Sequence, residues 1–254
     1  MAIKTEYKIL ARKYRPKSFN ELVGQDSIKM TLANSLNSGR INQAYLFTGI
    51  RGVGKTTTAR ILARTLNYTM DNINYDPKIE IKESGLNCDA ILHSRHPDVF
   101  EMDAASNTGI DHVREIINFA QTKPTLAKYK IFIIDEVHML SKQAFNGLLK
   151  ILEEPPDHVI FIFATTEIEK IPVTILSRCQ KFNLNRIESS VMGKYLAEVA
   201  KEETVKIDSA SIKIICNASE GSLRDALSIL DQAISMCSGD IKEKKIKVML
   251  NLND

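Results

Sequence analysis

Eight consecutive residues near the start of the chain have the types and spacing of a phosphate-binding loop. The segment Gly49-Ile50-Arg51-Gly52-Val53-Gly54-Lys55-Thr56 fits the pattern G-x-x-x-x-G-K-[ST] at every position. Glycines let backbone N–H groups turn inward around phosphate oxygens at the positive end of a helix. In this pattern the lysine is a point charge for the β- and γ-phosphates, and the threonine hydroxyl is a Mg²⁺ ligand. The residues predicted to contact a nucleotide are Gly49, Arg51, Gly52, Val53, Gly54, Lys55, Thr56 and Thr57.

A pair of carboxylates supplies the second chemical element. Asp135 and Glu136 directly follow the apolar run 131–134. A buried parallel strand delivers its last residues to the ligand-binding edge of an open α/β sheet. Asp135 is therefore expected to hold Mg²⁺, and Glu136 to orient and polarise an attacking water. Adjacent carboxylates are also common on surfaces, but their position after a buried strand in a chain with a phosphate loop favours nucleotide hydrolysis.

The same carboxylates also fit a helicase signature, because Asp135-Glu136-Val137-His138 reads D-E-x-H. A helicase of that type needs a second motor domain of similar size. The residues from 183 to 254 are too few to form one. A ring ATPase, in which a compact α/β domain carries a helical lid, fits the length better.

Short apolar strands alternate with helical segments around these motifs. The predicted strands are Ala44–Thr48, Asp98–Met102, Tyr129–Ile134 and His158–Ala164, and the predicted helices are Lys55–Leu66, Ile110–Thr122 and Lys142–Leu152. Strands that are apolar almost throughout indicate a parallel sheet covered by helices on both faces. The predicted fold class is therefore α/β.

The pattern changes after Arg178. Three helices are predicted there, over Ser189–Glu203, Ser209–Ala218 and Ser222–Met236, and no convincing strand follows about Phe182. We therefore predict an ATPase domain over 1–182, with an irregular insertion at about 67–97, and a small all-helical domain over 183–242. Residues 243–254 are expected to begin a further helical unit that the chain does not contain.

Composition excludes several classes of protein. The chain has 254 residues, of which 44% are hydrophobic, and a formal net charge of +3. These values exclude a disordered chain, and they require any nucleic-acid contact to come from local patches. The apolar runs are strand-sized and no apolar signal segment precedes them, so the expected location is the cytoplasm, away from membranes. Cys88, Cys179, Cys216 and Cys237 are expected to be reduced, buried thiols.

Several further phrases, taken in order, resemble one family. They are Arg12-Lys13-Tyr14-Arg15-Pro16, Val23-Gly24-Gln25, the run 103–110, the run 135–141, the run 149–156, Ala164-Thr165-Thr166, Ser177-Arg178-Cys179 and the run 221–227. From about Tyr7 to Asp240 the chain resembles the gamma/tau subunits of bacterial DNA polymerase III, the AAA+ ATPases of the replicative clamp loader. The resemblance implies an AAA+ P-loop NTPase domain with a parallel sheet, followed by a small all-helical lid domain.

The resemblance implies roles that spacing alone does not give. Thr166 falls at the sensor 1 position, which reads the γ-phosphate, with Thr165 as the fallback. Arg224 falls at sensor 2, and Arg178 at the arginine finger that completes a neighbouring subunit's site. Without the resemblance, both arginines read as members of surface salt bridges. The implied cofactors are ATP and Mg²⁺, and an isolated chain is expected to be a poor ATPase.

The resemblance also implies partners. They are the delta and delta prime subunits, further gamma/tau copies, the sliding clamp, and primer–template DNA held through its backbone phosphates. The polymerase core and the helicase are expected to bind only through C-terminal regions that this chain lacks, so it reads as an N-terminal fragment, expected to be monomeric. The basic residues Arg12, Lys13, Arg15 and Lys17 fit either a DNA phosphate contact or a solvated arm beside the nucleotide site.

Two rival functions remain to be distinguished. A branch-migration helicase would share the motor but need no clamp, and a structural subunit resembling delta prime would lack the intact phosphate loop. The implied holoenzyme is a DNA-directed DNA polymerase, a nucleotidyltransferase. No acidic cluster in this sequence offers the two-metal geometry of nucleotide addition, so we expect only ATP hydrolysis from this chain.

The insertion departs from the family pattern. Family members carry a four-cysteine zinc module there, of which only Cys88 matches. Tyr68 stands where the first ligand is expected, and Lys82 and Gly85 fall near the other two. One thiolate cannot make a tetrahedral four-cysteine site. Asp76 or His93 would have to serve as ligands outside the family's four-cysteine pattern. We therefore expect no zinc.

Overall fold

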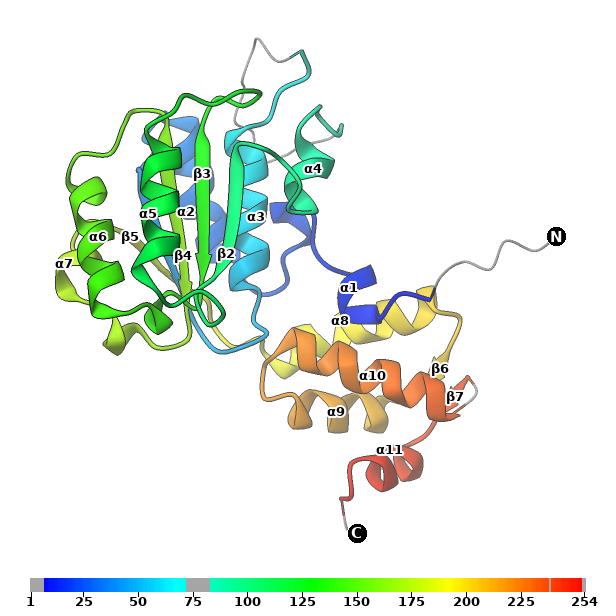
Figure 1. The fold of residues 1–254 in the computed structure, drawn as a ribbon. Coiled ribbons are helices and arrows are strands. Elements are labelled where there is room, and N and C mark those ends of the chain that lie inside the picture. Colours follow the sequence, from blue (N-terminus) through cyan, green and yellow to red (C-terminus); the bar gives the residue numbers. More distant parts are fainter. Residues whose placement is uncertain (1–6, 72–82, 238, 253–254) are drawn as a thin grey trace.

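The computed structural model describes residues 7–71, 83–237 and 239–252. A parallel sheet with helices on both faces forms the larger part of the molecule, and a bundle of helices lies to one side of it (Figure 1). Asp76 and Lys82, which the sequence analysis compared with the family's zinc module, lie outside the described residues.

Five strands form the sheet, in the order β2-β3-β4-β1-β5, and all neighbours are parallel. The strands are β1 (Ala44–Thr48), β2 (Val99–Asp103), β3 (Lys130–Asp135), β4 (Val159–Thr165) and β5 (Gln180–Asn183). The central position of β4, between β1 and β3, cannot be read from the order of the strands in the chain. It determines which loops meet at the carboxyl edge of the sheet.

Successive side chains of the central strands point to opposite faces, and each face has its own core. Phe47 and Ile133 belong to the core that α2 and α3 cover, whereas Leu46 and Phe132 belong to the core that α5 and α6 cover. The helices of this part are α2 (Asp26–Asn37), α3 (Lys55–Leu66), α4 (Cys88–Leu92), α5 (Ile110–Ala120), α6 (Lys142–Glu153) and α7 (Val173–Leu176), with short 3-10 turns at η1 (Phe19–Glu21), η2 (Val137–Met139) and η3 (Ile168–Lys170). Strands buried on both faces explain the continuous apolar runs of the sequence.

The second part of the molecule is the helical bundle that we call the lid. Its helices are α8 (Ser189–Glu202), α9 (Ser209–Ala218), α10 (Leu223–Cys237) and α11 (Glu243–Met249). Helix α1 (Leu10–Lys13), although first in the chain, also packs here, because Leu10 belongs to the same buried cluster as Leu196, Leu230 and Ile246. The N-terminal segment therefore connects the lid to the sheet.

The predicted strands and helices are confirmed, with small shifts at their ends. Three details were missed. The edge strand β5 was not predicted, helix α4 lies in the insertion expected to be irregular, and the expectation of no strand after Phe182 is wrong because β6 (Lys206–Ile207) pairs with β7 (Asp240–Ile241) in the lid. Among the described residues, no helix has the length and apolar character needed to cross a membrane.

Candidate active site

The phosphate loop follows β1 and leads into the first turn of α3. Gly49, Gly52 and Gly54 all have positive φ, a backbone conformation that side-chain-bearing residues rarely adopt. Lys55 is folded back beneath the loop, where its Nζ donates to the carbonyl oxygens of Gly49 (2.9 Å) and Ile50 (3.0 Å). Burial lowers the pKa of Lys55. An ammonium group held inside a loop of this shape is suited to an anionic ligand, which would restore its favourable electrostatics.

The predicted metal ligands meet across the sheet. The Thr56 hydroxyl donates to Asp135 Oδ2, although 79 residues separate the two in the chain. A hydroxyl and a carboxylate brought to one point are an oxygen donor set of the kind that Mg²⁺ takes beside phosphates. The residues therefore fit the metal that the sequence predicts.

Glu136 has an unusual backbone. Its φ is 46° and its ψ is 44°, the left-handed region, and its N–H donates to Asp135 Oδ1 (2.9 Å). A non-glycine residue held in that region stores about 1–3 kcal/mol of strain, and such residues cluster at functional sites. The turn directs the Glu136 carboxylate toward β4 rather than away from the sheet.

Thr166 donates hydrogen bonds to the Glu136 carboxylate. Glu136 Oε2 accepts from the Thr166 backbone N–H (3.2 Å) and from the Thr166 hydroxyl (3.0 Å). The contact follows from the strand order, because β4 lies between the strand that ends in the phosphate loop and the strand that ends in Asp135. Thr165, the fallback for the same role, is buried and its Oγ1 lies 2.9 Å from His138 Nδ1.

The lid is docked directly on the phosphate loop. The backbone N–H of Arg224, in the first turn of α10, donates to the carbonyl oxygen of Gly52 (3.2 Å). A Cβ atom at Gly52 would lie 2.1 Å from Ser222 Oγ and 3.1 Å from Arg224 Cβ. Arg224, predicted from the resemblance, is therefore close to the loop, and its side chain is exposed.

This close approach makes a substitution at Gly52 informative. We expect Gly52→Ala to displace the lid, and therefore to accelerate hydrogen exchange at the Arg224 amide by about tenfold or more, since backbone strain of 1–3 kcal/mol has to be relieved. Gly54→Ala is the matched control, because Gly54 also has positive φ but has no atom within 4 Å of its added Cβ. Equal exchange rates at Arg224 in the two variants would contradict the steric explanation.

Arg178 is not brought to this site. It precedes β5, whose first residue, Gln180, lies beside Tyr45 near the start of β1, whereas the phosphate loop follows the end of β1. Arg178 therefore lies toward the opposite edge of the sheet, where it donates to Glu153 Oε1 (2.7 Å) and to the Thr174 carbonyl (2.7 Å). The sheet geometry prevents it from serving the phosphate loop of its own chain.

The predicted basic cluster divides into separate contacts. Arg15 turns toward α3, where its Nε donates to Thr57 Oγ1 (3.0 Å), and burial followed by the nearby Arg60 lowers its pKa. Lys13 pairs with Glu203 of the lid (2.6 Å). Arg12 and Lys17 are exposed. Arg15 therefore lies beside the nucleotide site, whereas the exposed Arg12 and Lys17 do not share its contact.

The described part of the insertion is packed against α3. The Tyr68 ring lies so close to Gly85 that an added Cβ would be 2.9 Å from Tyr68 Cε2. Cys88 is buried, and His93 Nδ1 lies 3.1 Å from Asp89 Oδ1.

Cys216 and Cys237 are buried as predicted, whereas Cys179 is half-buried, and burial raises its pKa to about 12. The cysteines of the described residues are free thiols.

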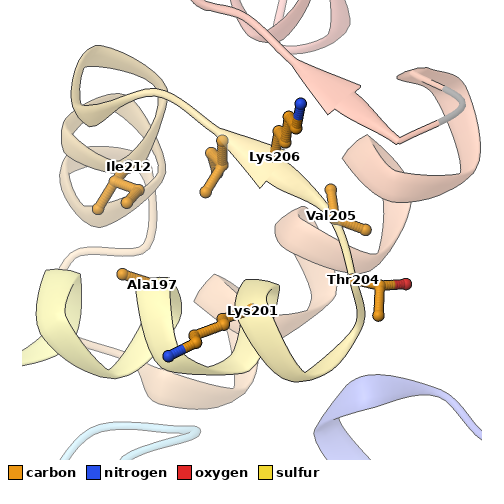
Figure 2. A pocket seen from close by; sticks show the side chains of 7 residues that line it. Ala197, Lys201, Thr204, Val205, Lys206 and Ile212 are labelled. Atoms are coloured by element: carbon orange, nitrogen blue, oxygen red, sulfur yellow. The ribbon is translucent and has the colours of Figure 1, made fainter.

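A further pocket, of about 440 Å³, lies within the lid and apart from the phosphate loop (Figure 2). Ala197 and Lys201 of α8, Lys206 of β6 and Ile212 of α9 line it. Its lining contains no carboxylate and none of the residues described above. The pocket therefore shares no residue with the phosphate loop.

Two family models match successive parts of the chain. Residues 24–188 match the family model described as "DNA polymerase III, delta subunit", and residues 192–239 match the one described as "DNA polymerase III clamp loader subunit, ATPase lid domain". The chain is 43% identical over 250 residues to the tau subunit of DNA polymerase III from Escherichia coli (strain K12), covering 98% of this chain and 38% of that protein. It is 42% identical over 246 residues to the gamma subunit from Buchnera aphidicola subsp. Acyrthosiphon pisum, covering 97% and 67%.

The fold is similar to that of solved structures. The Thermotoga maritima RuvB Holliday junction branch migration motor superposes with a TM-score of 0.68 at 20% identity, covering 94% of this chain and 72% of that one. At this identity the likeness establishes the AAA+ fold alone. The chain spans less than half the length of the tau subunits it matches.

Proposed function

Because the chain belongs to the gamma/tau subunit family of bacterial DNA polymerase III, we propose that it is an ATP-binding and ATP-hydrolysing motor subunit of a clamp loader. The observation that supports this most strongly is the convergence of Thr56, Asp135, Glu136 and Thr166 at the carboxyl edge of the sheet. The intact phosphate loop argues against a purely structural subunit.

The chain's own residues divide the chemistry among them. Lys55 and the backbone N–H groups of the phosphate loop bind the phosphates, and Thr56 and Asp135 hold Mg²⁺. Bound Mg²⁺ supplies positive charge that stabilises the transferring phosphoryl group. Glu136 orients a water molecule and accepts its proton. Thr166 makes the Glu136 carboxylate available for this role when its hydrogen bonds move from Glu136 to the γ-phosphate. Arg224 then couples the position of the lid to the nucleotide.

We propose that Arg178 completes the site of a neighbouring subunit. Its position at the far edge of the sheet from its own phosphate loop supports this role, since it keeps the guanidinium away from the nucleotide site of its own chain. Arginine fingers of this kind contribute about 10³–10⁵ to the rate of phosphoryl transfer. The isolated chain is accordingly a poor ATPase, and assembly is the step that activates it.

The family assigns the partners that we propose. They are delta and delta prime subunits, further gamma/tau copies, the sliding clamp, and primer–template DNA, whose backbone phosphates are contacted in a salt-dependent way. Polymerase core and helicase are contacted through regions outside this chain. ATP binding drives the closed arrangement through its differential affinity for the two states, and hydrolysis resets it. The cytoplasm is the proposed location.

The proposed domain division is 1–182, 183–242 and 243–254. The connector 184–188 between β5 and α8 supports the first boundary. Helix α11 packs on the lid through the buried Ile246, so the proposed third unit begins in contact with the lid. We further propose that no zinc is bound, since the Tyr68 ring lies against Gly85 where the family places ligands.

Stimulation of ATP hydrolysis distinguishes the proposed function from its rival. We expect the chain, assembled with delta-type partners, to hydrolyse ATP fastest when both sliding clamp and primed DNA are present. Stimulation by DNA alone, indifferent to the clamp, would favour a motor of the branch-migration type and would contradict the proposed partners.

Replacing Lys55 tests nucleotide binding directly. We expect Lys55→Ala to weaken ATP affinity by roughly 10- to 100-fold, because a charged hydrogen bond contributes about 1.5–3 kcal/mol. Lys29→Ala is the matched control, since Lys29 pairs with Asp26 on α2 and is not among the residues assigned to the site. Titration of each variant with a fluorescent ATP analogue measures the effect, and equal affinities would remove Lys55 from the site.

A further inference from the structure

The connector 184–188 passes from the core of the sheet to the core of the lid within a few residues. The Leu184 side chain belongs to the sheet core, and its N–H donates to the carbonyl oxygen of Thr48 at the end of β1 (2.8 Å). The Ile187 side chain belongs to the lid core, and its N–H donates to the carbonyl oxygen of Gly221 in the lid (3.1 Å). The two parts of the molecule are therefore joined through the two residues that lie between these attachments.

Gln25 attaches the first of those two residues, Asn185, to the sheet side. The Gln25 side chain is only 3% exposed, and its amide makes two hydrogen bonds with the Asn185 backbone. Its Nε2 donates to the carbonyl oxygen (2.9 Å), and its Oε1 accepts from the N–H (3.2 Å). A side-chain amide that uses both its donor and its acceptor fixes the orientation of the peptide as well as its position. Gln25 directly precedes α2, whose Ile28 and Leu32 belong to the sheet core.

Arg186 is the second of the two residues. Its side chain is exposed, and its Nη1 donates to the carbonyl oxygen of Glu220 in the lid (2.5 Å). Hinges in proteins consist of a few loop residues that absorb the changes in φ and ψ. With Asn185 held on the sheet side and Ile187 on the lid side, a rotation of the lid has to be absorbed at Arg186 and the bonds next to it.

The connector also lies against the phosphate loop. A Cβ atom at Gly49, the first residue of that loop, would lie 2.5 Å from the Leu184 carbonyl oxygen. Further along the same loop, the Gly52 carbonyl accepts the hydrogen bond from the Arg224 N–H of the lid. The lid is therefore positioned on the phosphate loop by two contacts, one through the connector and one through the start of α10.

We infer that Gln25 is a positioning residue for ATP binding, which anchors Asn185 so that the lid turns at Arg186 and presents Arg224 to the nucleotide in one orientation. Without the anchor the lid can adopt several orientations, of which only a fraction is competent to bind. The apparent affinity falls in proportion to that fraction. The inference rests on the proposed function, in which Arg224 couples the lid to the nucleotide.

Hydrogen exchange in Gln25→Met tests the anchor. Methionine keeps the length and the burial of the side chain but removes both hydrogen bonds. Asn185 is exposed, so water can hydrate its backbone groups and the fold is retained. We expect exchange at the Asn185 amide to accelerate by about tenfold or more. Exchange at the Leu184 and Ile187 amides is expected to change by less than about twofold, because their own hydrogen bonds remain.

Equilibrium titration with a fluorescent ATP analogue gives the second readout. We expect Gln25→Met to raise Kd by about three- to tenfold, and to leave kcat of the assembled complex at saturating ATP within about twofold. A side chain that only supported the fold would lower stability without this split between affinity and turnover.

Gln43→Met is the matched control. The Gln43 side chain also donates to the backbone, at the Pro156 carbonyl oxygen (2.9 Å), but it lies at the opposite end of β1 from the connector. We expect this variant to keep its Kd for the ATP analogue and its exchange rate at Asn185 within about twofold.

The outcomes separate the parts of the inference. Unchanged exchange at Asn185 in Gln25→Met would overturn the anchor, and equal acceleration at Asn185 and Ile187 would overturn the turning point at Arg186. Faster exchange at Asn185 with an unchanged Kd would overturn the role in ATP binding. If the unmodified chain bound no ATP, the proposed function would fail, while the exchange rates would still decide whether Gln25 anchors the connector.

Discussion

Glu136→Gln is expected to slow turnover severely while leaving ATP bound. The amide keeps the shape of the side chain and can still contact Thr166, but it cannot take a proton from water. A positioned general base contributes about 10²–10⁴ in rate, so we expect a loss of hydrolysis within that range. Single-turnover hydrolysis of labelled ATP by the assembled complex measures the chemical step, and equilibrium titration measures affinity.

The two readouts separate catalysis from folding. Glu136 adopts a left-handed backbone conformation, which glutamine can adopt at the same cost, so the variant keeps the local turn. Glu101→Gln is a control at another carboxylate, which pairs with Arg60 on α3 and lies outside the predicted catalytic group. Residual hydrolysis close to that of the unmodified protein in Glu136→Gln would remove Glu136 from its role.

Arg178→Ala is expected to lower hydrolysis by the assembled complex by about 10³–10⁵, and to leave the ATP affinity of the isolated chain unchanged. The reason is geometric, since Arg178 lies at the edge of the sheet opposite its own phosphate loop. Its ion pair with Glu153 is exposed and worth about 0–1 kcal/mol, so the fold should tolerate the change. Weakened ATP binding in the isolated chain would contradict the assignment to a neighbour.

Mixing two inactive variants tests the shared site further. A chain with Glu136→Gln keeps its Arg178, and a chain with Arg178→Ala keeps its own Glu136. If the finger acts between subunits, assemblies made from both chains regain hydrolysis at the junctions where an intact Arg178 faces an intact Glu136. Glu153→Ala is the control at the contact partner, and we expect it to retain hydrolysis. Inactive mixtures would indicate that Arg178 does not act across subunits.

The local elements of the site could be predicted from the sequence because they depend on short-range patterns. The phosphate loop, the strand before Asp135 and the helix after Lys55 each have a spacing that follows from strand or helix geometry. Small errors have local causes. Asp98 was assigned to a strand, but its buried carboxylate accepts backbone N–H groups from Thr125, Leu126 and Ala127, so the strand begins one residue later.

The relations between the elements could not be predicted in the same way. The contact between Glu136 and Thr166 requires β4 to lie between β1 and β3, and strand order is set by tertiary packing rather than by any local pattern. His138 was visible only as part of a helicase-like motif, and no spacing connected it to Glu167, whose Oε1 lies 3.1 Å from His138 Nε2. The packing of Leu10 in the lid is equally non-local, since nearly the whole chain separates it from Leu230.

Loading of a labelled sliding clamp onto primed circular DNA tests the central claim most directly. The assembled complex is incubated with clamp, DNA and ATP, and the clamp that remains with the DNA after gel filtration is counted. We expect loading with the unmodified chain and loss of loading with Lys55→Ala, with Lys29→Ala retaining it. Loading that persists without ATP or with Lys55→Ala, or ATP hydrolysis that never transfers a clamp to DNA, would contradict an ATP-driven clamp loader motor.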